Sequence, residues 1–137
     1  MSLKQTSVLL SRIALFVVYF WFGLLKVIGQ SPASPMVHGL FDKTMGPISP
    51  FMSFGLFIIL FGLFEMLIGV LFILPGLEKT AVILFFLHMI TTTLPLFVMG
   101  TMIWTGMFVP TLEGQYIIKN LALVACALTI WSSISKK

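Results

Sequence analysis

The segment Tyr19-Phe-Trp-Phe-Gly-Leu-Leu-Lys26 closes a long apolar run that starts near Ser7. Aromatic residues and a lysine stand where an apolar helix would leave a membrane. Such a lysine commonly extends its stem so that the ammonium reaches the lipid headgroups. Three later apolar runs also carry one ionisable residue each, namely Glu65, His88 and Lys119. The fold therefore depends on whether these four groups meet inside the molecule.

The composition identifies the class of protein. Of 137 residues, 59% are hydrophobic and 9% are charged, and the mean hydropathy is +1.14. A soluble domain of this length could not cover so much apolar surface with so few charges. About 20 apolar residues cross a hydrocarbon core of about 30 Å, so we predict one all-α domain over residues 1–137, an integral membrane four-helix bundle. Its expected helices cover residues 7–29, 51–74, 79–103 and 116–133.

Prolines interrupt the connection between the first two expected helices. Pro32, Pro35 and the pair Gly46-Pro47 break any long helix there. The apolar hexamer Met36–Phe41 lies between these breaks and would otherwise be exposed to water. We therefore expect it to form a short interfacial helix at the outer surface.

Small residues and a proline shape the later helices. In the second expected helix glycines recur every seven positions, at Gly55, Gly62 and Gly69. Small residues on one face let neighbouring backbones approach closely in lipid, so this stripe predicts packing. In the third expected helix, threonines at 91–93 precede Pro95. They predict a kink at which threonine hydroxyls bond back to helix carbonyls.

The distribution of basic residues predicts the orientation. One side of the membrane collects Lys4, Arg12, Lys79, Lys136 and Lys137. By the positive-inside rule both termini are expected to be cytoplasmic, in a multi-pass protein of the inner (plasma) membrane. The net charge of +4 is spread thinly and concentrates at the chain ends. It indicates contact with membrane lipid and no binding to nucleic acid.

Depth along the helices brings the ionisable groups together. At a rise of about 1.5 Å per residue, Glu65 and His88 lie roughly 15 and 13 Å above the cytoplasmic end, and Lys26 lies somewhat higher. An unpaired charge in hydrocarbon costs at least about 2.5–3.5 kcal/mol, so these groups should face the bundle interior. We predict a Lys26–Glu65 pair, with His88 bonded to Glu65 or to a thiol or hydroxyl group. Lys119 is expected to cap this group from the outer side. One histidine and one glutamate supply too few ligands for a zinc or iron site.

Four blocks of the sequence resemble, in order, those of the DoxX-like membrane proteins. They are Phe20–Lys26, Gly62–Glu65 with Gly69, Thr91–Leu96 and Glu113–Asn120. Within that family the chain is most similar to the branch of reactive-chlorine-resistance membrane proteins. The resemblance implies a four-helix membrane fold and a link to redox or oxidative-stress physiology. Some members are subunits of quinone-reducing complexes, and others join superoxide-detoxifying enzymes.

Three functions stay open at this point. The first is a redox accessory subunit that binds a quinone-like or other small amphipathic ligand. Its head would contact Lys26, Glu65, His88 and Lys119, with Trp21 and Tyr19 as aromatic walls. Lysine, histidine and glutamate can donate hydrogen bonds to quinone carbonyls and pass protons on reduction.

The second function is a non-enzymatic transporter or channel for an anion or a proton. The third is a partner-binding membrane scaffold in which the polar groups only clamp the bundle, because buried ion pairs often serve specificity more than activity. Quinone is the candidate cofactor, and a redox enzyme or a second copy of the chain is the candidate partner. Whether the chain itself catalyses a reaction stays open.

Overall fold

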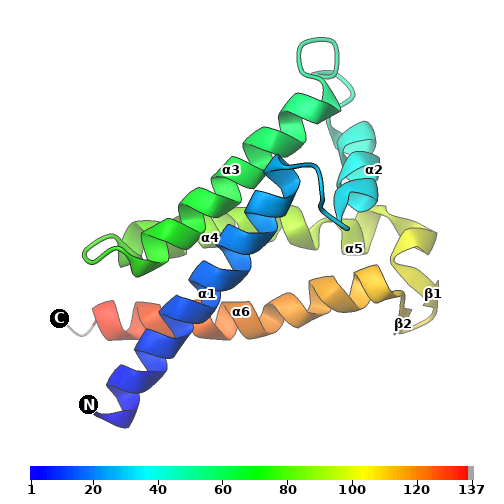
Figure 1. Ribbon diagram of the computed structural model, residues 1–137. Coiled ribbons are helices and arrows are strands. Elements are labelled where there is room, and N and C mark those ends of the chain that lie inside the picture. The colour runs from blue at the N-terminus through cyan, green and yellow to red at the C-terminus, as the bar shows by residue number, and fades with distance from the viewer. Residues whose placement is uncertain (136–137) are drawn as a thin grey trace.

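The computed structural model describes residues 1–135, and the protein is 76% helical (Figure 1). The long helices are α1 (Leu3–Val27), α3 (Phe54–Ile73), α4 (Glu78–Thr93) and α6 (Leu112–Ile134). The shorter elements are α2 (Ser34–Thr44), α5 (Pro95–Val98), the 3₁₀ turn η1 (Gly100–Met102) and the antiparallel strands β1 (Trp104–Gly106) and β2 (Val109–Pro110). Four helical segments are long and apolar enough to cross a membrane. Three are the single helices α1, α3 and α6, and the fourth is α4 together with α5. The predicted four-helix membrane fold is confirmed.

Glycines bring α1 and α3 into close contact. A Cβ added to Gly62 would lie 2.6 Å from the Gly23 carbonyl oxygen, and one added to Gly69 would lie 2.9 Å from the Phe20 nitrogen. These distances are too short for any larger side chain, so the packing role predicted for these two glycines is confirmed. Gly55 is exposed, and a Cβ there would meet only the Ser53 hydroxyl, at 4.0 Å, so the packing prediction is wrong at this position.

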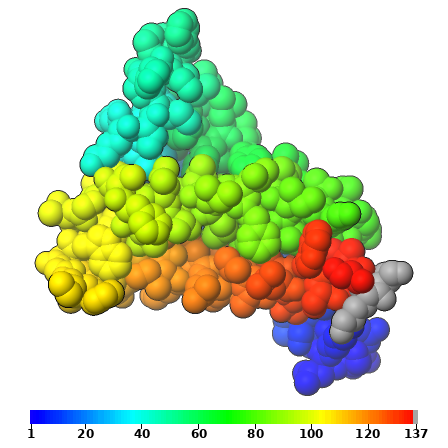
Figure 2. Space-filling model, turned by 180° about the vertical axis from the view of Figure 1, so that it is seen from behind, coloured from blue at the N-terminus to red at the C-terminus, as the bar shows by residue number. Residues whose placement is uncertain are grey.

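The four long helices form two crossing pairs. Helix α1 packs along α3, and α4 packs against α6 (Figure 1). From behind, α4 and α6 lie side by side across the molecule, while α2 and the first turns of α3 project beyond them (Figure 2). The main core lies where the two pairs cross, and its fully buried side chains include Leu15, Ile68, Phe72, Phe85 and Ile130.

Helix caps move two predicted helix starts by four residues. Helix α1 begins at Leu3 because the Ser2 hydroxyl accepts from the Gln5 backbone N–H while the Gln5 side chain accepts from the Ser2 backbone N–H. Helix α6 begins at Leu112 because the Thr111 hydroxyl accepts from the Gly114 N–H. The predicted starts at residues 7 and 116 are therefore wrong.

The third predicted helix is broken at its proline. Helix α4 ends at Thr93, and Pro95 opens the separate short helix α5, because proline lacks the N–H that would continue the helix. The Thr91 hydroxyl donates to the His88 carbonyl at 2.6 Å and the Thr93 hydroxyl to the Met89 carbonyl at 2.7 Å. The threonine bonds are confirmed, but where a kink was predicted the helix is interrupted at Leu94, and a continuous helix to residue 103 is wrong.

The connections after α1 and α5 are more ordered than expected. Helix α2 contains the predicted Met36–Phe41 segment and extends beyond it at both ends, with Val37 and Phe41 buried. The segment expected to be a loop before α6 instead contains the β1–β2 hairpin. The Trp104 indole N–H donates to the Leu96 carbonyl at 2.9 Å, which ties the hairpin to α5. This region comprises α2, the hairpin and the helix ends next to them. We call it the loop end of the molecule.

Arg12 closes the opposite end of the bundle. Its guanidinium donates to the carbonyls of Phe72 and Ile73 at 2.7 and 3.1 Å, and it pairs with Glu78 at 2.9 Å. A cation there satisfies the last carbonyls of α3 and favours the helix dipole. The first turn of α1 and the last turns of α6 lie toward this same end (Figure 1). Lys136 and Lys137, which contributed to the predicted charge asymmetry, lie outside the described residues.

Candidate functional site

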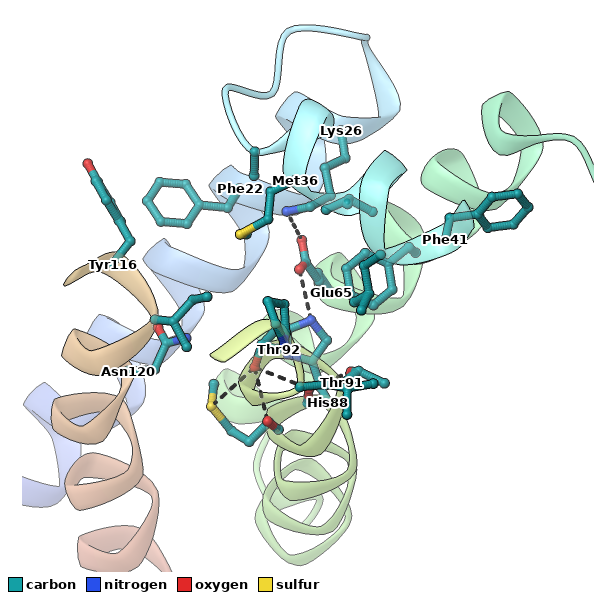
Figure 3. A pocket seen from close by; sticks show the side chains of 18 of the residues that line it. Phe22, Lys26, Met36, Phe41, Glu65, His88, Thr91, Thr92, Tyr116 and Asn120 are labelled. Atoms are coloured by element: carbon teal, nitrogen blue, oxygen red, sulfur yellow. Dashed lines mark hydrogen bonds and ion pairs between the residues drawn. The ribbon is translucent and has the colours of Figure 1, made fainter. Parts of the chain in front are cut away.

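Four side chains from three helices form a continuous hydrogen-bonded network. The Lys26 ammonium donates to Glu65 Oε2 at 2.8 Å, and His88 Nε2 lies 2.8 Å from Glu65 Oε1. The Tyr19 hydroxyl lies 3.0 Å from His88 Nδ1. None of the four residues is more than 6% exposed. We call this set the buried network (Tyr19, Lys26, Glu65 and His88); Figure 3 shows the bonds between its last three members.

Helix periodicity and one glycine bring the network together. Tyr19 and Lys26 are seven residues apart, so they lie on one face of α1, two turns from each other. Gly62 precedes Glu65 by three residues on α3, and a Cβ there would lie 2.9 Å from the Lys26 Cβ. The absence of a side chain at Gly62 therefore leaves room for the Lys26 stem beside Glu65. His88 completes the network from α4, about a turn and a half before the proline break.

The hydrogen bonds of the network converge on the Glu65 carboxylate. One of its oxygens accepts from the Lys26 ammonium, and the other contacts His88 Nε2. The role of each His88 nitrogen depends on its tautomer: a neutral ring with its proton on Nε2 donates to Glu65 and accepts from the Tyr19 hydroxyl at Nδ1. Among residues 1–135, every buried side-chain nitrogen and oxygen has a hydrogen-bond partner.

The predicted pairing is confirmed in both parts. Lys26 pairs with Glu65, and His88 bonds both to Glu65 and to a hydroxyl group. Tyr19, predicted as an aromatic wall, is also the hydroxyl partner. Sequence reasoning missed Phe61, whose ring stacks on His88 at 5.1 Å and lies 5.8 Å from the Lys26 ammonium. Its spacing of four residues before Glu65 was the available signal, because such residues share a helix face.

Two residues predicted for the site lie elsewhere. Lys119 is exposed, with its ammonium 5.7 Å from the Tyr116 ring, so the prediction that it caps the network is wrong. Helix α6 turns Ile117 and Asn120 toward the interior instead. Trp21 is 61% exposed, because it follows the buried Tyr19 by two residues and so lies on the other side of α1. It is not a wall of the site.

A cavity of about 370 Å³ lies beside the buried network (Figure 3). The network residues form its polar wall, and most of the other lining side chains are apolar. They come from all four long helices and from α2, and include Phe22, Met36, Phe41, Tyr116, Ile117 and Asn120. Phe22 and Tyr116 are about half exposed, at 47% and 59%, so the cavity reaches the surface between α1 and α6.

The second histidine does not join the site. His38 lies on the exposed side of α2, where its Nε2 is 3.8 Å from Asp42 and its ring stacks on Phe54 at 4.1 Å. Within residues 1–135, no three histidine, cysteine, aspartate or glutamate side chains come close enough together to hold a metal ion.

Comparison of the chain with family models, with curated proteins and with solved structures gives no significant match. The resemblance to DoxX-like proteins therefore rests on the four sequence blocks alone and stays a prediction.

Proposed function

We propose that this protein binds a small amphipathic, quinone-like ligand within the membrane and acts as a redox accessory protein of the DoxX-like type. One observation carries the proposal. A charged, hydrogen-bonded network forms one wall of a cavity that is otherwise mostly apolar. Ligand sites commonly combine an apolar lining with a few placed polar groups in this way.

The network has the groups that a quinone head requires. Toward the described residues, the Lys26 ammonium makes one hydrogen bond, to Glu65, so two of its three N–H groups can donate to a ligand carbonyl. Reduction of a quinone consumes two electrons and two protons, and a partner enzyme would supply the electrons. The Lys26 ammonium could give one of these protons to the reduced head, and the second proton would come with the electrons from the partner enzyme.

Access from the lipid phase suits such a ligand. The cavity opens between α1 and α6, beside Phe22 and Tyr116. The neighbouring outward side chains of these two helices are apolar and exposed, among them Leu24, Ile118 and Leu121. A hydrophobic ligand in the bilayer would reach the network through this opening without crossing water.

The packing between the buried network and the Arg12 end favours ligand binding over transport. The interior between His88 and the Arg12 end is filled by Leu15, Ile68 and Phe72, which are fully buried and apolar. A channel or proton path would need polar groups through this region. Flux into liposomes that requires Glu65 would favour transport instead.

Ligand binding by the purified protein tests the proposal. Decyl-1,4-benzoquinone is titrated by calorimetry into wild-type protein and into Lys26→Met, Met36→Trp and Lys119→Met variants. Met36→Trp fills cavity space while keeping every network residue, and Lys119→Met is the matched control because Lys119 is exposed outside the cavity. We expect binding to be lost in the first two variants and kept in the control. Equal binding by all four folded proteins, or none by the wild type, would contradict the proposal.

A further inference from the structure

Helix α6 brings an amide side chain to the cavity, opposite the buried network. Asn120 lines the cavity and is half-buried, whereas the neighbouring Lys119 is exposed. Figure 3 shows the Asn120 amide reaching into the cavity from the α6 side, across from α3 and Glu65. The side-chain amide of Asn120 makes no hydrogen bond to any residue among 1–135.

The α6 neighbours of Asn120 at the cavity offer it no side-chain hydrogen bond. They are Tyr116, Ile117 and Leu123, of which Ile117 and Leu123 are apolar and lie three residues to either side. An apolar residue at position 120 would continue this stripe and fill space. An amide inside a membrane span normally finds a hydrogen-bond partner on another helix, because the alternative is costly in hydrocarbon. The missing partner of Asn120 is therefore expected to be a ligand.

The hydrogen-bonding groups that face the cavity define the ligand. Both oxygens of Glu65 are already bonded, to Lys26 and His88, so the carboxylate has little capacity left for a ligand donor. The Lys26 ammonium can only donate, and its positive charge disfavours a cationic head. Asn120 adds an amide on the opposite side, with N–H₂ donors and a carbonyl acceptor. The cavity thus offers donors from two sides.

We propose that Lys26 and Asn120 hold the two opposite carbonyl groups of a single ring, and that Asn120 is the residue that selects such a ring over an apolar one. This inference rests on the proposed function and deepens it. The ring lies against Phe61 and Tyr19, which pack on His88. Its apolar tail leaves between Phe22 and Tyr116.

Two probes and three variants test this assignment. Decyl-1,4-benzoquinone carries two ring carbonyls, and decylbenzene has the same tail without them. The variants are Asn120→Leu, Asn120→Asp and, as the matched control on the adjacent position, Lys119→Leu. Asn120→Leu is apolar and close in size, and Asn120→Asp keeps the shape but loses the N–H₂ donors. Thermal unfolding of each variant verifies that it is folded.

The dissociation constants of the two probes distinguish the outcomes. We expect Asn120→Leu and Asn120→Asp to weaken benzoquinone binding about tenfold, the effect of one hydrogen bond. Decylbenzene binding to Asn120→Leu and both probes' binding to Lys119→Leu should stay as in the wild type. If a folded Asn120→Leu binds the benzoquinone as tightly as the wild type does, the assignment of Asn120 is overturned while the proposed function stands. If the wild type does not bind the benzoquinone, the proposed function fails, and this inference with it.

Discussion

The lysines at positions 26 and 119 have opposite surroundings although both stand near the loop-end limits of their helices. Lys26 is 6% exposed and bonded to Glu65, while Lys119 is exposed beside Tyr116. The face of the helix decides the difference. An exposed lysine can extend toward the headgroups, but the Lys26 side chain points across the α1–α3 contact and needs its carboxylate partner.

A double-mutant cycle measures this dependence. We expect Glu65→Ala to lower the free energy of unfolding by about 3–5 kcal/mol, because it leaves a buried ammonium without its partner. Lys26→Met should lower the free energy of unfolding by a similar amount, because it leaves the buried Glu65 carboxylate without its partner. The double variant removes both charges and should cost less than the sum of the two. Unfolding of each protein in detergent gives these values.

Two further variants complete this cycle. Glu65→Gln keeps the shape and part of the hydrogen bonding, so it should unfold at a higher temperature than Glu65→Ala. Lys119→Met should change stability by less than about 0.5 kcal/mol, as exposed substitutions usually do. Purely additive effects of Glu65→Ala and Lys26→Met would mean that the two residues are not coupled.

At the scale of helices, the glycine contact between α1 and α3 positions the network. We expect Gly62→Ala to destabilise the protein by about 1–3 kcal/mol, because the added methyl group overlaps the Gly23 carbonyl and the Lys26 stem. It should also push Lys26 away from Glu65 and weaken ligand binding. Gly55→Ala on the same helix is the matched control, since its methyl group would meet only the Ser53 hydroxyl, at 4.0 Å. Equal unfolding temperatures for the two variants would show that the crossing tolerates a wider spacing.

The end of α3 depends on Arg12 more than on the ion pair with Glu78. Arg12→Gln removes the charged donor to two terminal carbonyls and should cost about 1–3 kcal/mol. Glu78→Gln removes only a partly exposed ion pair and should cost about 0.2–1 kcal/mol. Denaturant unfolding of the two variants compares them directly. A larger effect of Glu78→Gln would mean that the ion pair, and not the capping of α3, closes this end.

The sequence predicted the helices and the Lys26–Glu65 pair better than it predicted which side chains of each helix point inward. Long apolar runs define the spans by length, and the cost of an isolated charge in lipid is high enough to predict that Lys26 meets Glu65. Helix starts were misplaced where caps at Ser2 and Thr111 add a turn. The rotation of α6 could not be read, because lipid-facing and inward-facing residues are both apolar and leave no amphipathic signal. For this reason Lys119 was predicted as the site residue of α6, whereas its neighbour Asn120 is the one that lines the cavity.

For the molecule as a whole, the two ends differ in character. One end holds Arg12 with Glu78, and the other holds α2 and the hairpin, whose tip residues Met107 and Phe108 are 87% and 88% exposed. Four crossings of a bilayer would leave the start of α1 and the end of α6 on one side. The excess of basic residues near these ends predicts that this side is the cytoplasm.

Cysteine labelling tests that orientation. In a Cys126→Ser background, Lys4→Cys and Met107→Cys each place one exposed thiol at opposite ends of the molecule. We expect a membrane-impermeant maleimide to label Met107→Cys in intact cells and Lys4→Cys only after the membrane is opened. Labelling of Lys4→Cys in intact cells would reverse the predicted orientation.

The contacts of α1 also constrain the order in which the nascent chain can enter the membrane. Glu65 is synthesised 39 residues after Lys26, and the carbonyls that Arg12 caps come later still. The first helix therefore emerges from the ribosome with cations near both ends and no partner for either. Its lysine would extend toward the headgroups until α3 arrives. We therefore expect α1 to reach its final depth in the bilayer only after α3 has been inserted beside it.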